Sequence, residues 1–204
     1  ISFFINIAHE IRTPLTLITG PLEKVINNRG LPEETRHYLH TMDKNSKRLL
    51  QLVDQLLDFR ETELQGYRLS FERKEIVTIL NENFIRFKDA ADENRLKFEI
   101  SSNVKQLFLS LDEEAFMKIF SNLLANAVKY AKSRIKVSLN YTEGEKSLTI
   151  EVTNDGQKIP PENRSRIFQP FFRGENAEFK PGTGLGLPIA RSLAELHSGT
   201  LELV

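Results

Sequence analysis

The chain contains no cysteine. This absence excludes a disulfide framework, a thiolate nucleophile and a zinc site with cysteine ligands. The chain also lacks an excess of either charge, because 28 Lys and Arg residues balance 28 Asp and Glu residues. No global field therefore attracts nucleic acid or an anionic membrane, and we expect neither as a direct partner.

Long apolar runs are absent as well. No uninterrupted run approaches the roughly 20 residues that a membrane-spanning helix needs, and no signal peptide is recognisable. The 204 residues, 40% of them hydrophobic, suffice for one large or two small domains with real cores. Because the chain starts without Met and stops within the strand-like GTLELV, we interpret it as a soluble piece of a longer protein.

The first 60 residues carry a heptad pattern that predicts two helices. A first helix should end near NNRGLP, where Gly30 can close it and Pro32 can open the next one. The two apolar seams are Phe4, Ile7, Ile11, Leu15, Ile18, Leu22 and Val25, then Leu39, Met42, Ser46, Leu49, Val53 and Leu56. Further apolar residues make the hairpin's apolar face wider than one partner helix can cover, so we expect a dimeric four-helix bundle.

Beyond a joint near residues 60–68 the pattern changes to strands and helices. LKFEISS, LFLSL, RIKVSLNY and SLTIEVTN have strand character, and helical stretches lie at about Ile76–Asn94, Asp112–Ala131 and Leu185–His197. This order predicts a mixed sheet with helices on one face. We therefore expect a dimerisation unit over residues 1–64 and an α/β unit over residues 65–204, with its last strand truncated.

The segment HEIRTPL places His9 on the predicted first helix, two positions past the seam residue Ile7. His9 should therefore face water, with Glu10 beside it and Thr13 one turn later. Pro14 has no amide hydrogen, which predicts a bend just beyond the histidine. A neutral imidazole is a competent nucleophile, and an adjacent carboxylate can orient the ring and take up its proton.

HEIRTPL resembles the H-box of sensor histidine kinases, the dimerisation and phosphoacceptor module of two-component signalling. The resemblance implies that His9 is phosphorylated, that Glu10 is the base and that Thr13 positions water in phosphatase action on the response regulator. The other histidines, His37, His40 and His197, have no comparable setting, and we expect them to have structural roles only.

In the second unit, FSNLLANAVKYA puts Asn122, Asn126 and Lys129 on one helix face. An asparagine oxygen can ligate a hard cation beside phosphate oxygens, and a lysine can neutralise phosphate charge. The segment resembles the N-box of the same family. That resemblance implies Asn126 on Mg²⁺, with Asn122 and Lys129 near the phosphates of ATP.

A glycine-rich turn, GTGLGL, stands directly before the last predicted helix. Its glycines allow close backbone approach to phosphate at a helix start. It is neither a Rossmann fingerprint nor a P-loop, and it resembles the family's G2 box, which implies nucleotide contacts from Gly182, Thr183, Gly184, Leu185 and Gly186. IFQPFFRG resembles the F-box, so residues 173–183, starting with the nucleotide-contacting Arg173, should form a lid over ATP, with Gly174 and Gly182 as hinges.

The G1 box departs from the family pattern, which is Asp, any, Gly, any, Gly. In VTNDGQKIP, aligned on Gly156, Asn154 occupies the aspartate position and Lys158 replaces the second glycine. Asn154 can accept a hydrogen bond from the adenine amino group, but without the strengthening negative charge. We expect adenine recognition with weaker affinity; Asp155 would substitute only through a one-residue shift that spoils the Gly156 spacing.

The resemblance covers nearly the whole chain and implies an α plus α/β fold: a helical-hairpin dimer followed by the α/β sandwich ATP-binding domain shared with DNA gyrase, the Hsp90 chaperone and MutL. It implies an ATP- and Mg²⁺-dependent protein-histidine kinase that passes its phosphoryl group to an aspartate of a response-regulator receiver domain. The parent would be a sensor kinase anchored in the inner membrane with this portion in the cytoplasm, and FFINIAHEIRTPLTLI suggests a hybrid kinase.

Two alternatives remain open. One is an ATP hydrolase of the gyrase and Hsp90 class, which carries a water-activating glutamate where this chain has Asn122, a poor general base. The other is a phosphatase-biased or scaffold module in which the G1 departures impair ATP binding.

Overall fold

The computed structural model describes residues 2–27, 30–63, 68–174 and 182–204, and leaves the side chains of residues 2–7, 9 and 61–63 undescribed. The chain divides into two compact units, residues 1–66 and 67–204. No helix in the described ranges is long and apolar enough to cross a membrane.

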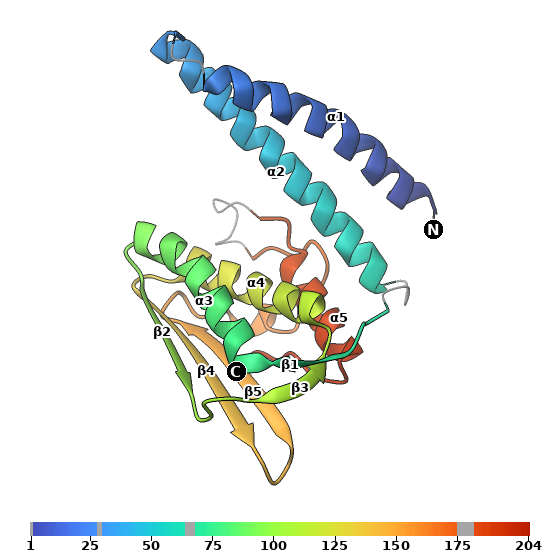
Figure 1. Ribbon diagram of the computed structural model, residues 1–204, viewed down its shortest axis with the longest axis vertical. Helices are drawn as coiled ribbons and strands as arrows, with labels where there is room; N and C mark the ends of the chain where they lie inside the picture. The colour runs from blue at the N-terminus through green and yellow to red at the C-terminus, as the bar shows by residue number, and fades with distance from the viewer. Residues whose placement is uncertain (1, 28–29, 64–67, 175–181) are drawn as a thin grey trace. The chain divides into compact units, whose positions relative to one another are not determined.

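The first unit is a hairpin of α1 (Ser2–Ile26) and α2 (Glu33–Glu63), shown in blue and cyan in Figure 1. The helix α1 continues through Pro14 and Pro21 without interruption. The two helices thus lie where the heptad patterns place them. The bend expected beyond His9 stays a prediction, and residues 28–29 of the expected NNRGLP turn lie outside the described part.

The contact between the two helices differs from the predicted seam. Its core consists of Ala8, Leu15, Val53 and Leu57, with Leu50 packed against it. Thr19 and Ser46, each 9% exposed, are also buried. Five seam residues, Ile11, Ile18, Val25, Met42 and Leu49, are 43–55% exposed in the single hairpin. Small side chains let the helices approach closely, and hydrophobic periodicity gives such residues little weight.

The second unit contains two small sheets rather than the single mixed sheet that we expected. The strands β2 (Lys97–Ser102), β4 (Arg134–Thr142) and β5 (Ser147–Asn154) form one sheet in the order β2-β4-β5. In it β2 is parallel and β5 antiparallel to β4. The strands β1 (Glu72–Glu75) and β3 (Phe108–Leu111) pair separately.

Two differences from the sequence prediction concern strands. β1 was not predicted, because its sequence ERKE is wholly charged and has no apolar alternation. The prediction of a strand in GTLELV is wrong, since residues 199–204 have no regular structure. The other four strands coincide with the predicted segments.

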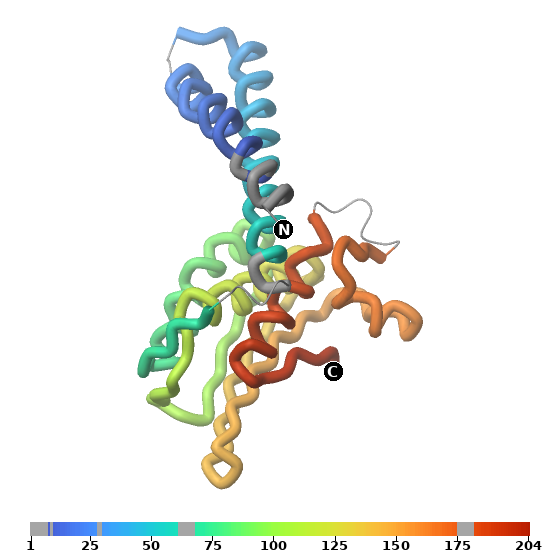
Figure 2. Tube along the Cα trace, turned by 90° about the vertical axis from the view of Figure 1, so that its right-hand side faces the viewer, coloured from blue at the N-terminus to red at the C-terminus, as the bar shows by residue number. Residues whose placement is uncertain are grey.

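Three helices pack with the sheets: α3 (Ile76–Glu93), α4 (Glu113–Tyr130) and α5 (Gly186–Leu196), and a 3₁₀ turn, η1, spans Pro161–Asn163. The three α-helices lie over one face of the three-stranded sheet (Figures 1 and 2). The core shared by α3, α4, β3 and β4 consists of Ile76, Leu80, Leu111, Phe120, Leu124, Val137 and Leu139. The face of α4 away from this core is thereby left to carry the polar residues of the N-box.

Carboxylates fix the starts of two of these helices. Glu75 caps α3 by accepting from the Val77 and Thr78 amides at 3.2 and 2.7 Å. Asp112 caps α4 by accepting from the Ala115 amide at 2.9 Å. Side-chain acceptors at these positions satisfy amides that have no partner inside the helix.

Candidate active site

The helix α1 carries the expected phosphoacceptor residues. Ala8, only 1% exposed, lies in the hairpin core, and Glu10 and Thr13 are exposed. The His9 side chain is outside the described part of the chain, so its expected orientation toward water stays a prediction. Since neighbouring helical positions are about 100° apart, the burial of Ala8 places one side of this segment in the core.

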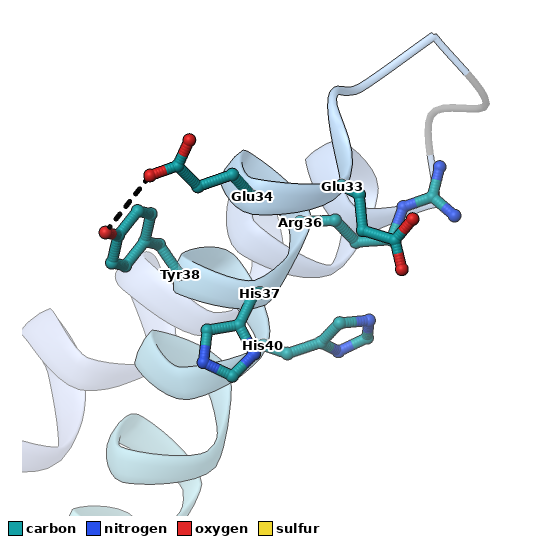
Figure 3. A pocket seen from close by; sticks show the side chains of 6 residues that line it. All are labelled: Glu33, Glu34, Arg36, His37, Tyr38 and His40. Carbon is teal, nitrogen blue, oxygen red and sulfur yellow. Dashed lines mark hydrogen bonds between the residues drawn. The ribbon is translucent and has the colours of Figure 1, made fainter.

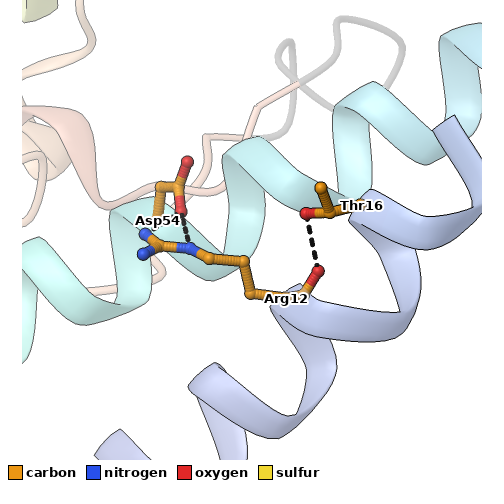
Figure 4. A network of polar contacts seen from close by, with 3 residues as sticks. All are labelled: Arg12, Thr16 and Asp54. Atoms are coloured by element: carbon orange, nitrogen blue, oxygen red, sulfur yellow. Dashed lines mark hydrogen bonds and ion pairs between the residues drawn. The ribbon is translucent and has the colours of Figure 1, made fainter. Parts of the chain in front are cut away.

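An ion pair joins the two helices one turn after His9 (Figure 4). The Arg12 Nε donates to Asp54 Oδ1 at 3.0 Å, and Arg12 Nη2 contacts the same oxygen. Thr16 Oγ1 donates to the Arg12 carbonyl at 2.9 Å. Sequence reasoning missed this pair, because an arginine and an aspartate on two charged helices are too common to single out.

Both helices of the hairpin also have exposed apolar side chains, and we call this set the apolar stripe. Its members are 43–57% exposed: Ile11, Ile18 and Val25 on α1, and Tyr38, Met42 and Leu49 on α2. The α1 members recur every seven residues, which keeps them on one side of the helix. Apolar residues gathered in this way are typical of a surface that another element covers.

In the second unit the glycine-rich turn lies directly against α4. A Cβ built on Gly186 would be 2.7 Å from Asn122 Oδ1, and one on Gly182 would be 2.7 Å from Lys129 Nζ. The fold therefore brings GTGLGL together with two of the three predicted N-box residues. Any side chain at these two glycines would have to displace Asn122 or Lys129.

Asn126 is half-buried one turn beyond Asn122. The Asn122 Nδ2 donates to the Lys118 carbonyl at 2.9 Å, whereas the Asn126 side chain makes no hydrogen bond to any described residue, and its oxygen is available to a ligand. The described residues form no cluster of His, Asp and Glu able to hold a metal ion. A cation at Asn126 would therefore need the oxygens of a bound phosphate, an arrangement that suits Mg²⁺.

The middle of the turn is tied to the F-box segment through backbone contacts. Gly184 has φ +76°, and its carbonyl accepts from the Phe171 amide at 3.1 Å. Phe171 itself has φ +63°, and a Cβ on Gly184 would be 2.7 Å from the Phe171 carbonyl carbon. Thr183 Oγ1 accepts from the Leu185 amide at 3.1 Å.

Two aromatic rings of the F-box segment, Phe168 and Phe172, have packing contacts with arginines. The guanidinium of Arg191 lies over the Phe168 ring at 4.9 Å, and that of Arg166 lies over the Phe172 ring at 4.4 Å. Arg173 is exposed. Residues 175–181, most of the expected lid, lie outside the described part.

The G1 segment forms a tight turn. Asn154 Oδ1 accepts from the Gly156 amide at 2.9 Å, and a Cβ on Gly156 would be only 2.1 Å from the Tyr130 carbonyl oxygen at the end of α4. Glycine is thus required at residue 156 because the backbone of α4 passes so close. The contact also joins the G1 turn to the helix that carries Asn122, Asn126 and Lys129.

Asp155 faces a different set of partners. Its carboxylate accepts from the amides of Lys132, Ser133 and Arg134 at 2.9–3.1 Å and from Ser133 Oγ at 2.6 Å. The hydrogen bonds from Ser133, followed by those from Arg134 and Lys132, hold the pKa of Asp155 far below its usual value. A one-residue shift that brings Asp155 to the position of Asn154 would break this network. The network therefore argues against Asp155 as the residue that recognises adenine.

His197 at the end of α5 is structural, as expected. Its Nε2 accepts from the Asp112 amide at 3.2 Å, and its Nδ1 lies 2.8 Å from the Leu193 carbonyl and donates to it in the neutral tautomer. Burial alone would raise the pKa of Asp112, but hydrogen bonds from the Ala115 and Ser70 amides lower it.

His37 and His40 lie in an open hollow of about 450 Å³ at the start of α2 (Figure 3). Glu33, Glu34, Arg36 and Tyr38 complete its lining. Tyr38 Oη donates to Glu34 at 3.5 Å. The hollow contains none of the predicted site residues.

Comparison with known families identifies the family of the chain. A model described as "His Kinase A (phospho-acceptor) domain" matches residues 2–64, and one described as "Histidine kinase-, DNA gyrase B-, and HSP90-like ATPase" matches residues 111–204. The chain belongs to the sensor histidine kinases. The expected fold class is confirmed with it: a helical hairpin followed by an α/β ATPase-type domain.

Individual histidine kinases resemble the chain over its whole length. Histidine kinase P4 of Formosa agariphila is 32% identical over 209 residues, which cover 100% of this chain and 15% of that protein. Sensor protein SrrB of Staphylococcus aureus is 28% identical and covers 98% of this chain and 35% of its own length. The chain thus spans well under half of the length of these two relatives.

Solved structures of histidine kinases share the fold. Full-length ShkA in complex with AMPPNP aligns with a TM-score of 0.82 and 25% identity, over 95% of this chain and 40% of that one. Histidine kinase ThkA in complex with response regulator protein TrrA aligns with a TM-score of 0.64 and 24% identity, over 97% of this chain and 55% of that one.

Proposed function

We propose that this histidine kinase core transfers the γ-phosphoryl group of ATP to His9. The observation that supports the proposal best is the contact of Gly182 and Gly186 with Lys129 and Asn122. It forms a glycine-lined cradle beside a lysine and two asparagines, in a chain that also carries HEIRTPL on an exposed helix. Backbone amides, a lysine and a helix start suit a polyphosphate.

In the proposed step a nitrogen of neutral His9 attacks the γ-phosphorus. A nitrogen–phosphorus bond forms, the bond from phosphorus to the oxygen bridging the β- and γ-phosphates breaks, and ADP leaves. Glu10, exposed and adjacent, takes the proton that the ring releases. Lys129 and the amides of the turn hold the phosphates in line, because such transfers depend on alignment and charge stabilisation.

Asn126 would hold Mg²⁺ together with phosphate oxygens, and the ion would neutralise charge on the phosphates. Asn122, at the position of the water-activating glutamate of related hydrolases, has an amide that cannot take a proton from water. This favours transfer to His9 over ATP hydrolysis. Arg173, Thr183 and Leu185 complete the proposed nucleotide contacts.

The same resemblance supports two partners. We infer that two copies associate through the apolar stripe, since it is exposed in one copy and lies on the unit that matches the phospho-acceptor model. We also infer a response-regulator receiver domain as acceptor of the phosphoryl group from His9, as ThkA has been solved with TrrA.

Thr13 would position water for the opposing phosphatase reaction, which hydrolyses the phosphorylated response regulator. Residues 1–64 would serve dimerisation and phosphoacceptance, and residues 65–204 catalysis, in the cytoplasmic part of a membrane-anchored parent.

The test is incubation of the chain with γ-labelled ATP and Mg²⁺, followed by assay for acid-labile, alkali-stable label. The variants His9→Gln and Asn126→Ala should both lose the label. Matched controls are His37→Gln and Asn81→Ala, exposed helical residues outside the proposed site, which should keep it. Absence of label in a folded wild-type dimer would contradict the proposal and favour the phosphatase-biased or scaffold module.

A further inference from the structure

The hydrogen bonding of the G1 turn determines which atoms Asn154 can offer to a base. Its Oδ1 accepts from the Gly156 amide at 2.9 Å and lies 2.6 Å from the position of a Cβ on that residue. Because an amide N–H must face an acceptor, this contact fixes the orientation of the side-chain amide. The oxygen therefore uses one of its two lone pairs within the turn, and Nδ2 is the side-chain atom that makes no hydrogen bond to the described residues.

No neighbouring carboxylate takes over as acceptor for an amino group of the base. The Asn154 side chain is exposed, and no residue in the described ranges takes a hydrogen bond from its Nδ2. Asp155, the adjacent carboxylate, is occupied by the amides of residues 132–134. An aspartate at residue 154 would have two oxygens, one for the Gly156 amide and one for a ligand, whereas asparagine has a single oxygen.

The chemistry of purines then sets a preference. Adenine presents an amino donor at position 6, whereas guanine and hypoxanthine present an oxygen acceptor there. The Asn154 Nδ2 is a donor, so it matches a 6-oxo group and opposes a 6-amino group. Adenine can meet this donor only through a ring nitrogen, N1, N3 or N7.

We propose that Asn154 determines base specificity by presenting an amide donor, so that this site binds 6-oxo purine nucleoside triphosphates at least as well as ATP. The inference rests on the proposed function, which puts the base beside Asn154 and the phosphates at the cradle.

Inosine triphosphate is the sharpest probe, since it differs from ATP only at position 6 and the N1 proton. Calorimetric titration of the whole chain with each nucleotide and Mg²⁺ should give a dissociation constant for inosine triphosphate no larger than that for ATP. In Asn154→Asp the dissociation constant for inosine triphosphate, divided by that for ATP, should rise at least about tenfold. This is the effect of one charge-assisted hydrogen bond to the adenine amino group. Asn140→Asp, the same change at an exposed residue of β4, should leave the ratio unchanged.

The outcomes separate the inference from the function on which it rests. A wild-type dissociation constant that is larger for inosine triphosphate than for ATP, or an unchanged ratio in Asn154→Asp, would overturn the role of Asn154 while leaving the kinase proposal intact. Binding of neither nucleotide would overturn both. Asn126→Ala should weaken both nucleotides equally, because it acts on the phosphate side.

Discussion

Replacing Gly186 with Ala tests the packing of the glycine-rich turn on α4. The new Cβ would lie 2.7 Å from Asn122 Oδ1, closer than real Cβ contacts come. To make room, the Asn122 amide must move and lose its 2.9 Å hydrogen bond to the Lys118 carbonyl. That loss costs about 1 kcal/mol and the crowding about 1–2 kcal/mol. Alanine regains up to about 1 kcal/mol over glycine in a helix, which leaves a net destabilisation of about 1–2 kcal/mol.

A double-mutant cycle isolates the contact. In an Asn122→Ala background the nearest remaining atom of residue 122, its Cβ, is 3.8 Å away. Gly186→Ala should then be neutral, or stabilising by up to about 1 kcal/mol. The coupling free energy between the two positions should be about 2–3 kcal/mol.

Scanning calorimetry of the whole chain measures the effect, because the two units can unfold separately. Leu124→Ala, a change in the buried core of the second unit, identifies that unit's transition. Gly144→Ala is the matched control, since a Cβ there meets nothing within 4 Å. An equal cost of Gly186→Ala in both backgrounds would refute the contact with Asn122.

Three further outcomes follow from the described contacts. Ile18→Asp, within the apolar stripe, should weaken the proposed dimer about 30- to 100-fold by sedimentation, because each copy loses burial of a half-exposed isoleucine worth about 1 kcal/mol; an unchanged dimer would exclude the stripe from the interface. Asp112 and Asp155 have pKa values below their usual range, so the stability they provide is present above the unfolded-state pKa of about 3.9 and is lost as the pH falls through the lower folded pKa values. Between pH 6 and pH 2 the thermal stability of Asp155→Asn should therefore fall less steeply than that of the wild type. Identical pH profiles of the variant and the wild type would contradict this. Asn83 is fully buried with an unpaired Oδ1, so Asn83→Leu should stabilise the second unit by about 1 kcal/mol by calorimetry; destabilisation would show that the amide is satisfied in solution.

The sequence predicts the elements of this fold well where apolar periodicity is strong. The helices α1, α3 and α4 and strands β2, β4 and β5 lie close to their predicted segments. The periodicity fails for β1, whose four charged residues are held by pairing with β3 and not by an apolar face. It also fails for GTLELV, which alternates like a strand but pairs with no described strand.

Motifs predict which site residues exist but not what each of them contacts. Glycines in GTGLGL suggest a close approach, and the structure adds that Asn122 and Lys129 are the groups approached. The partners of Asp155 could not be predicted, since they are backbone amides 21–23 residues away whose position depends on the pairing of β4 with β5. In contrast, the hydrogen bond of Asn154 Oδ1 within its own turn is typical of asparagine and can be predicted from the sequence.

The rotation of α1 about its own axis is where sequence and structure differ most, and a physical reason can be given. Both the face with Ala8 and Leu15 and the apolar stripe could pack on α2, so burial of apolar area alone does not choose between them. Arg12 lies on the face that contacts α2, and its pairing with Asp54 is lost if α1 turns the stripe inward. With side chains 43% and 50% exposed, the pair adds little stability. The pair therefore adds only slightly to the preference for the observed rotation, in which Ile11, Ile18 and Val25 stay exposed.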